Sequence, residues 1–88
     1  MSLAIHKYEI RQDTVNMPKG ALLLHAESQL GLFFVWAIVD LDEKEAEQRN
    51  FLVIGTGRKF DKSDLPHMRH LTTFQKDMFV WHVFEWVP

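Results

Sequence analysis

The sequence predicts an all-β fold of mainly antiparallel strands, a small six-stranded sandwich or open barrel with at most a short helical turn. Short segments in which apolar and polar residues alternate recur along the 88 residues, and this period of two is typical of half-buried strands. Glycine and proline separate these segments as turn-forming residues do, and no segment keeps a helical period. A sandwich and an open barrel have the same strand pattern, so both architectures remain open.

The first half of the chain begins with an alternating strand and a turn. Residues 5–11 place charged side chains on one face and apolar side chains on the other. The motif Met17-Pro18-Lys19-Gly20 predicts a β-turn in which Pro18 takes the second position and Gly20 the fourth. The alternation then resumes in a second strand over residues 21–29.

Hairpins and two long loops connect the remaining strands. Gly31 predicts a hairpin turn into a strand over residues 32–39. Residues 40–48 are interpreted as a long hairpin loop whose second half joins the next strand, and residues 58–70 as an irregular loop. The other expected strands cover residues 51–54, 71–75 and 78–87, with the last hairpin turn around Lys76 and Asp77.

Two of the expected strands, residues 32–39 and 79–86, are apolar on both faces. A two-layer sandwich buries only one face of each sheet. These strands therefore need a further cover from a loop, a curled barrel wall or a second subunit, and the pattern leaves self-covering and a homo-oligomer equally open. At an interface between subunits we expect the aromatic residues Phe33, Trp81 and Trp86, because large aromatic side chains dominate interface energetics.

Size and composition exclude several classes of protein. A chain of 88 residues and 10.4 kDa forms one domain, expected to cover residues 1–88, and Met1-Ser2-Leu3 resembles the short prefix left by an expression vector. The absence of cysteine excludes a disulfide scaffold and a thiolate metal site, and a net charge of −2 argues against a general nucleic-acid coat. The longest apolar run, residues 30–39, has about half the length of a membrane-spanning helix, so we expect a soluble protein without membrane contact.

No motif in the sequence nominates an enzyme. His67 and His70 have a spacing that metal sites use, but Pro66 argues against a helix there and no third ligand is apparent, so we expect no metal and no other cofactor. His82 is interpreted as a hydrogen-bonded core residue of an apolar strand. The Gly55-Thr56-Gly57 motif lacks the ending and the helix of a phosphate loop, so we expect it to bend the end of a strand.

Charged residues are distributed unevenly between the two long loops. The first loop is acidic, and an ion pair between Asp40 and Arg49 at its ends would fix the hairpin register. The second loop carries the basic residues Arg58, Lys59, Lys62 and Arg69. A few basic residues suffice for weak, salt-sensitive phosphate binding, and Phe60 and Phe74 would offer rings on which bases stack.

Several short motifs occur together and in order along the chain: Lys7–Ile10, Met17–Ala21, Gln29, Trp36–Asp40, Arg49–Gly57 and His82–Glu85. In these motifs the chain resembles a family of small proteins of unknown function encoded by bacteriophages and prophages. The resemblance covers residues 7–86 and implies a compact β domain in a phage setting, in the cytoplasm of the bacterial host cell or associated with the virion. It implies no activity, ligand or catalytic residue.

The sequence therefore predicts a non-enzymatic phage or prophage protein that acts through protein–protein contacts, either with further copies of itself or with another protein. The alternative is a nucleic-acid-binding accessory protein that uses the basic loop 58–70. A third hypothesis, a small metal-assisted enzyme, would depend on His67 and His70.

Overall fold

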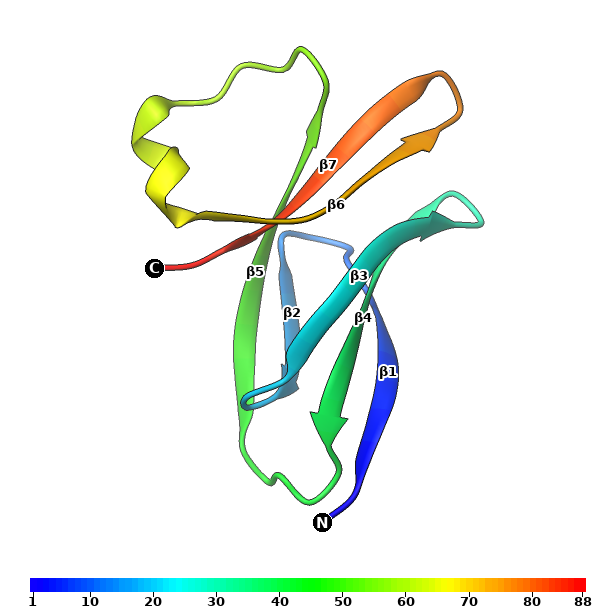
Figure 1. Cartoon of the computed structure of the whole chain (residues 1–88), viewed down its shortest axis with the longest axis vertical. Helices are drawn as coiled ribbons and strands as arrows, with labels where there is room; N and C mark the ends of the chain where they lie inside the picture. Colours follow the sequence, from blue (N-terminus) through cyan, green and yellow to red (C-terminus); the bar gives the residue numbers. More distant parts are fainter.

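The computed structural model describes all residues, 1–88, and arranges seven strands in two antiparallel sheets (Figure 1). The elements are β1 (Leu3–Glu9), β2 (Thr14–Pro18), β3 (Leu22–Gln29), β4 (Leu32–Asp40), β5 (Ala46–Gly55), η1 (Lys62–His67), β6 (Met68–Lys76) and β7 (Phe79–Trp86). The three-stranded sheet has the order β1–β4–β3 and the four-stranded sheet the order β2–β5–β7–β6. The antiparallel all-β class is confirmed, and neither sheet closes into a barrel.

The predicted number of six strands is wrong, because β2 is a strand where only a turn was expected. Val15 and Met17 of β2 are buried while the residues beside them are exposed, which is the alternation of a short strand with one buried face. All five residues of β2 pair with the first half of β5. β2 was not predicted because it has only five residues and ends in a proline.

Two tight turns reverse the chain in its first half. The turn after β2 begins one residue later than predicted, because the Ala21 amide donates to the Pro18 carbonyl at 3.1 Å. Gly20 therefore takes the third position, where a type II turn requires the positive φ of 82° that it adopts. Between β3 and β4, Leu30 and Gly31 both have positive φ, as in the turns that match the twist of a hairpin. The hairpin expected at Gly31 is thus confirmed.

The segment 58–70 is more regular than the irregular loop that was predicted. The 3₁₀ helix η1 occupies Lys62–His67, and β6 begins directly after it at Met68. Asp61 caps η1, since its carboxylate accepts a hydrogen bond from the Ser63 amide at 2.9 Å. No helix in the structure has the length and apolar character needed to cross a membrane.

The hydrophobic core lies between the two sheets. Val35, Ala37 and Val39 are the inward residues of β4 and are completely buried. They belong to one cluster with Phe51 of β5 and Val83 of β7. Successive residues of a strand face opposite sides, so Phe34, Trp36 and Ile38 point away from this core.

The edge strands β3 and β6 bring the two sheets together along one side of the sandwich (Figure 1). The Ala26 amide of β3 donates to Thr72 Oγ1 of β6 at 2.9 Å. Both strands have an interrupted register near this contact, at Leu24 in β3 and at Leu71 in β6. The hydroxyl of Thr72 thereby satisfies a buried amide for which no strand partner exists.

The segment between β5 and β6 covers part of the outward face of the four-stranded sheet. It forms a lobe beside β5 and β7, at the end of the molecule away from the N-terminus (Figure 1). Ile54, which pairs with His82 on this outward face, is buried, and the ring of His67 stacks on that of Trp86 at 4.8 Å. The two-sided strand β7 is thus partly covered from within its own chain, whereas Phe79 and Val80 at its start stay exposed.

Candidate functional site

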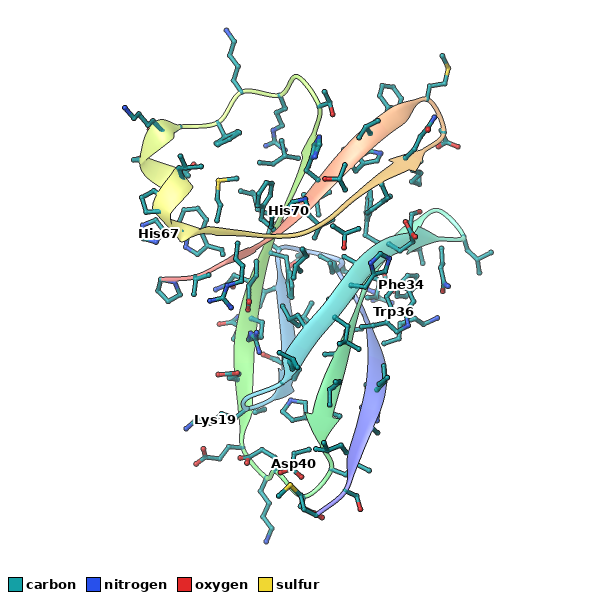
Figure 2. All side chains as sticks on the ribbon, viewed as in Figure 1. Lys19, Phe34, Trp36, Asp40, His67 and His70 are labelled. Atoms are coloured by element: carbon teal, nitrogen blue, oxygen red, sulfur yellow. The ribbon has the colours of Figure 1, made fainter.

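The outward face of the three-stranded sheet is apolar and is left uncovered. Ile38 on β4 lies opposite Ile5 on β1, which is 62% exposed, and opposite Leu22 on β3, which is 61% exposed. In the view of Figure 2, Phe34 and Trp36 lie on the opposite side of the molecule from His67. We define the open face as the residues Leu3, Ile5, Leu22, Leu24, Phe34, Trp36 and Ile38. Exposed apolar patches of this kind mark contact surfaces.

Polar side chains border the open face. The Lys7 ammonium lies 4.6 Å from the centre of the Phe34 ring and donates a hydrogen bond to Gln29 Oε1 at 3.2 Å. His25 Nε2 lies 3.5 Å from a carboxylate oxygen of Glu27. A shallow depression of about 430 Å³ at this border is lined by Ile5, Leu24, His25, Glu27, Gln29 and Trp36. An apolar centre with a polar rim is the usual anatomy of a protein–protein interface.

The aromatic residues expected at an interface are engaged within the chain. The ring of Phe33 lies 5.7 Å from that of Trp81 and 5.8 Å from that of Phe74. Trp86 is stacked against His67. All three residues named by the sequence are half-buried by these contacts, and their role at an interface stays a prediction.

The four basic residues expected to bind nucleic acid do not form one cluster. Arg58, Lys59 and Lys62 are exposed on the segment that covers part of the outward face of the four-stranded sheet. Arg69 lies on the inward side of β6, opposite Glu85, with its guanidinium 3.7 Å from the Glu85 carboxylate. Three of the four cations therefore share one exposed segment, and Arg69 is directed elsewhere.

Of the two aromatic residues expected to stack on bases, only Phe60 is accessible. Phe60 is half exposed on the segment after β5, whereas Phe74 is buried in the core. A depression of about 190 Å³ beside Phe60 is lined by Ile54, Gly55, Thr56, Gly57, Arg58, His82 and Phe84. One aromatic ring, one guanidinium and this depression are the groups that a nucleotide would find here.

A chain of hydrogen bonds crosses the outward face of the four-stranded sheet. His82 Nε2 is 2.7 Å from Thr56 Oγ1, and His82 Nδ1 is 3.0 Å from Thr73 Oγ1. Thr73 Oγ1 is in turn 2.8 Å from His70 Nε2. Both ring nitrogens of His82 thus have hydroxyl partners, as expected for a hydrogen-bonded strand residue, but His82 lies on the outward face and not in the core. The contact with Thr56 ties the segment after β5 to the sheet.

His67 and His70 face different partners. His67 Nδ1 is 2.9 Å from the Val87 carbonyl, and its ring rests on Trp86, while His70 contacts Thr73. The structure contains no group of three or more His, Cys, Asp or Glu side chains that could hold a metal ion.

A buried ion pair that the sequence analysis missed joins β5 to β7. Arg49 Nε donates to the carboxylate of Glu85, whose side chain is only 6% exposed, and Arg49 Nη1 donates to the Ala21 carbonyl at 2.9 Å and to Glu47 at 3.3 Å. The hydrogen bond with Glu85 is the main cause that raises the pKa of Arg49 above its usual range. The predicted pairing of Arg49 with Asp40 is wrong, because Arg49 points into the sandwich. The missed signal was a charged residue, Glu85, at a position whose alternation with Trp81 and Val83 directs it inward.

Comparison with known proteins identifies a family but no characterised relative. The whole chain, residues 1–88, matches the model of a family described as a domain of unknown function, DUF7352. No curated protein and no solved structure matches the chain. The all-β protein with the open face on its three-stranded sheet therefore belongs to the DUF7352 family.

Proposed function

We propose that this protein is a non-enzymatic bacteriophage or prophage protein that acts through protein–protein contacts and forms a homo-oligomer. The observation that carries the proposal is the open face, in which Ile38 lies between the exposed residues Ile5 and Leu22 of the two flanking strands. The phage setting is supported by the ordered motifs that the chain shares with small phage and prophage proteins.

The accessible area supports a second copy as the partner. The chain exposes 6227 Å², which is about 800 Å² more than the roughly 5,400 Å² expected for a compact monomer of its mass. Each partner in an interface of standard size contributes about 800 Å². Closed two-fold dimers are the commonest assemblies of soluble proteins, so a second copy of this chain is the partner that we propose.

The mass in solution tests this proposal. Light scattering on a sizing column is expected to give a dimer or a larger assembly at low and at high salt, because apolar contacts are insensitive to screening. A 10.4 kDa monomer at both salt concentrations would refute self-association. An assembly present only at low salt would show that contacts between charged residues hold it together.

Nucleic-acid binding is the second candidate, and the grouping of Arg58, Lys59 and Lys62 beside the accessible ring of Phe60 favours it. Replacing the three cations with alanine is expected to abolish a mobility shift with single-stranded DNA or RNA at low salt, while Arg69→Ala leaves it unchanged. Binding of the unmodified protein should fall steeply as salt rises. Absence of any shift at low salt removes this candidate.

A further inference from the structure

We infer that a second copy of this chain joins at the free edge of β1, through antiparallel pairing of the two β1 strands about a two-fold axis at His6. The inference rests on the self-association proposed above and specifies how the two copies meet. The two sheets have four edge strands: β1 and β3 in the three-stranded sheet, and β2 and β6 in the four-stranded sheet. An unpaired strand edge is a template for another strand, and proteins usually block such edges.

Three of the four edges are blocked by devices known to prevent pairing. β2 has only five residues and ends at Pro18, which has no amide hydrogen. β3 and β6 lie against each other, joined by the hydrogen bond from Ala26 to Thr72, and each has an irregular register. None of these three edges offers a long regular row of free amides and carbonyls.

The edge of β1 has none of these devices. All seven residues Leu3–Glu9 pair with β4 without a register shift, and the strand contains no proline. Lys7, whose charge would discourage pairing, extends over the sheet face to Phe34 and Gln29 instead of across the edge. Glu9 is likewise paired with Arg11 at 3.1 Å. The charges of β1 therefore leave its backbone accessible.

Two backbone hydrogen bonds establish which groups face this edge. The Leu41 amide donates to the Ser2 carbonyl at 2.9 Å, and the Ile10 amide donates to the Phe33 carbonyl at 2.8 Å. Each bond joins residues that lie directly opposite when the β1–β4 register is extended by one position. Even-numbered residues of β1 therefore bond to β4. Because bonded and non-bonded pairs alternate, the odd-numbered residues Leu3, Ile5, Lys7 and Glu9 direct their amides and carbonyls to the free edge.

The pattern of free groups selects one register between two copies. In an antiparallel pair, outward-directed residues must lie opposite outward-directed residues, so odd positions meet odd positions. Pairing Ile5 with Lys7 of the other copy, and Leu3 with Glu9, uses all four outward residues of both strands. Shifting the register by two residues in either direction pairs only three outward residues of each strand. One of these shifts also places Lys7 opposite Lys7 of the other copy, and like charges directly opposite are destabilising. The favoured register has its two-fold axis at His6.

This pairing enlarges the surface on which the proposed function rests. The two three-stranded sheets become one six-stranded sheet, in which the open faces of both copies lie on the same side. Ile5 and Leu3, both highly exposed in one copy, then have cross-strand neighbours. Edge pairing itself covers neither open face, so the dimer presents a continuous apolar surface about twice as wide as that of one copy.

Cysteine cross-linking tests the register directly, because the chain contains no cysteine. In the proposed dimer the two His6 residues form a non-hydrogen-bonded pair with Cα atoms about 4.5 Å apart, within the range for a disulfide. Under a mild oxidant His6→Cys is expected to form a covalent dimer at least tenfold faster than the control variant Leu24→Cys, which carries its thiol on the open face away from the edge. Equal rates for the two variants, or faster cross-linking of Leu24→Cys, would overturn the inference.

A second pair of variants distinguishes the contribution of the Ile5 backbone amide to dimerisation from that of the Ile5 side chain. Ile5→Pro removes an amide that faces the free edge and leaves the bonds to β4 intact, so it is expected to give a folded monomer by circular dichroism and light scattering. Ile5→Ala, which keeps the amide, is expected to remain a dimer. If Ile5→Pro does not fold, the His6→Cys result decides alone. If folded Ile5→Pro remains a dimer, or if Leu24→Glu dissociates the dimer, edge pairing is refuted but self-association is not. If the unmodified protein is a monomer, both are refuted.

Discussion

Replacing Glu85 with alanine is expected to destabilise the fold, because it breaks the ion pair with Arg49. Glu85 accepts a hydrogen bond from Arg49, and both side chains are buried, with exposed fractions of 6% and 15%. At an effective dielectric constant of about 20, unit charges about 4 Å apart attract each other by about 4 kcal/mol. Removing one partner of a buried pair costs about 3–5 kcal/mol, because it leaves the other charge uncompensated.

The remaining partners of Arg49 place the cost at the lower end of this range. Arg49 keeps its hydrogen bonds to the Ala21 carbonyl and to Glu47, so we expect Glu85→Ala to lower the free energy of unfolding by about 3 kcal/mol. A domain of this length has a total stability of about 4–13 kcal/mol. The change should therefore lower Tm by about 12–24 °C. The matched control is Glu47→Ala, which removes a more exposed partner of the same guanidinium and should cost less than about 1 kcal/mol.

Urea unfolding followed by tryptophan fluorescence measures both variants, at one fixed protein concentration because the unfolding of an oligomer depends on concentration. The double variant Arg49→Met, Glu85→Leu is expected to recover most of the loss, since an apolar pair of similar volume can replace a buried ion pair. A cost below about 1 kcal/mol for Glu85→Ala would refute the reasoning. The reasoning would also be refuted if the double variant lost as much stability as Arg49→Met and Glu85→Leu lose when measured singly and added, because the two residues would then not act as a pair.

Three further predictions concern a turn, a buried hydrogen bond and a helix cap. Leu30→Asn should raise the free energy of unfolding by about 0.5–1 kcal/mol, because Leu30 is fully exposed at a positive φ that asparagine tolerates; urea unfolding that shows a loss contradicts this. Thr72→Val leaves the Ala26 amide without its acceptor and should cost about 1–3 kcal/mol in the same assay, whereas Thr72→Ser should cost less. Hydrogen bonds from the Ser63 amide and then from its hydroxyl lower the pKa of Asp61, so its cap is intact above the usual aspartate pKa and is lost as pH falls through the lowered value. The NMR shift of the Ser63 amide should titrate with a midpoint below 3.8, and a midpoint at or above 3.8 would show that the cap does not form.

The sequence predicts the class of this fold well, because alternation reports directly on strands that bury one face. It does not predict β2, where five residues ending in Pro18 give too short a pattern. It also does not place Glu85, since the partner of an inward-facing charge depends on which strands become neighbours. Arg49 is thirty-six residues away in the chain and is brought to Glu85 only by the pairing of β5 with β7.

The sequence predicted an apolar surface for protein contacts, but not the residues that form the open face. A surface for protein contacts was expected from the two strands that are apolar on both faces, but periodicity cannot show which of their faces stays uncovered. The aromatic residues chosen by size, such as Trp86, are the ones that the chain itself covers. The most exposed residues of the open face are aliphatic, such as Ile5 and Leu22, and their exposure follows from strand order, which the sequence pattern does not contain.

Strand order and loop length together explain why a loop covers part of the outward face of one sheet and none covers that of the other. The only long connection, residues 56–67, leaves β5 and returns to β6, both of which belong to the four-stranded sheet. It can therefore cross the outward face of that sheet alone. The connections to and from β1, β3 and β4 have between two and five residues each, too few to span a sheet face. No connection of the three-stranded sheet is therefore long enough to cross the outward face of β4, and no loop covers Trp36 and Ile38.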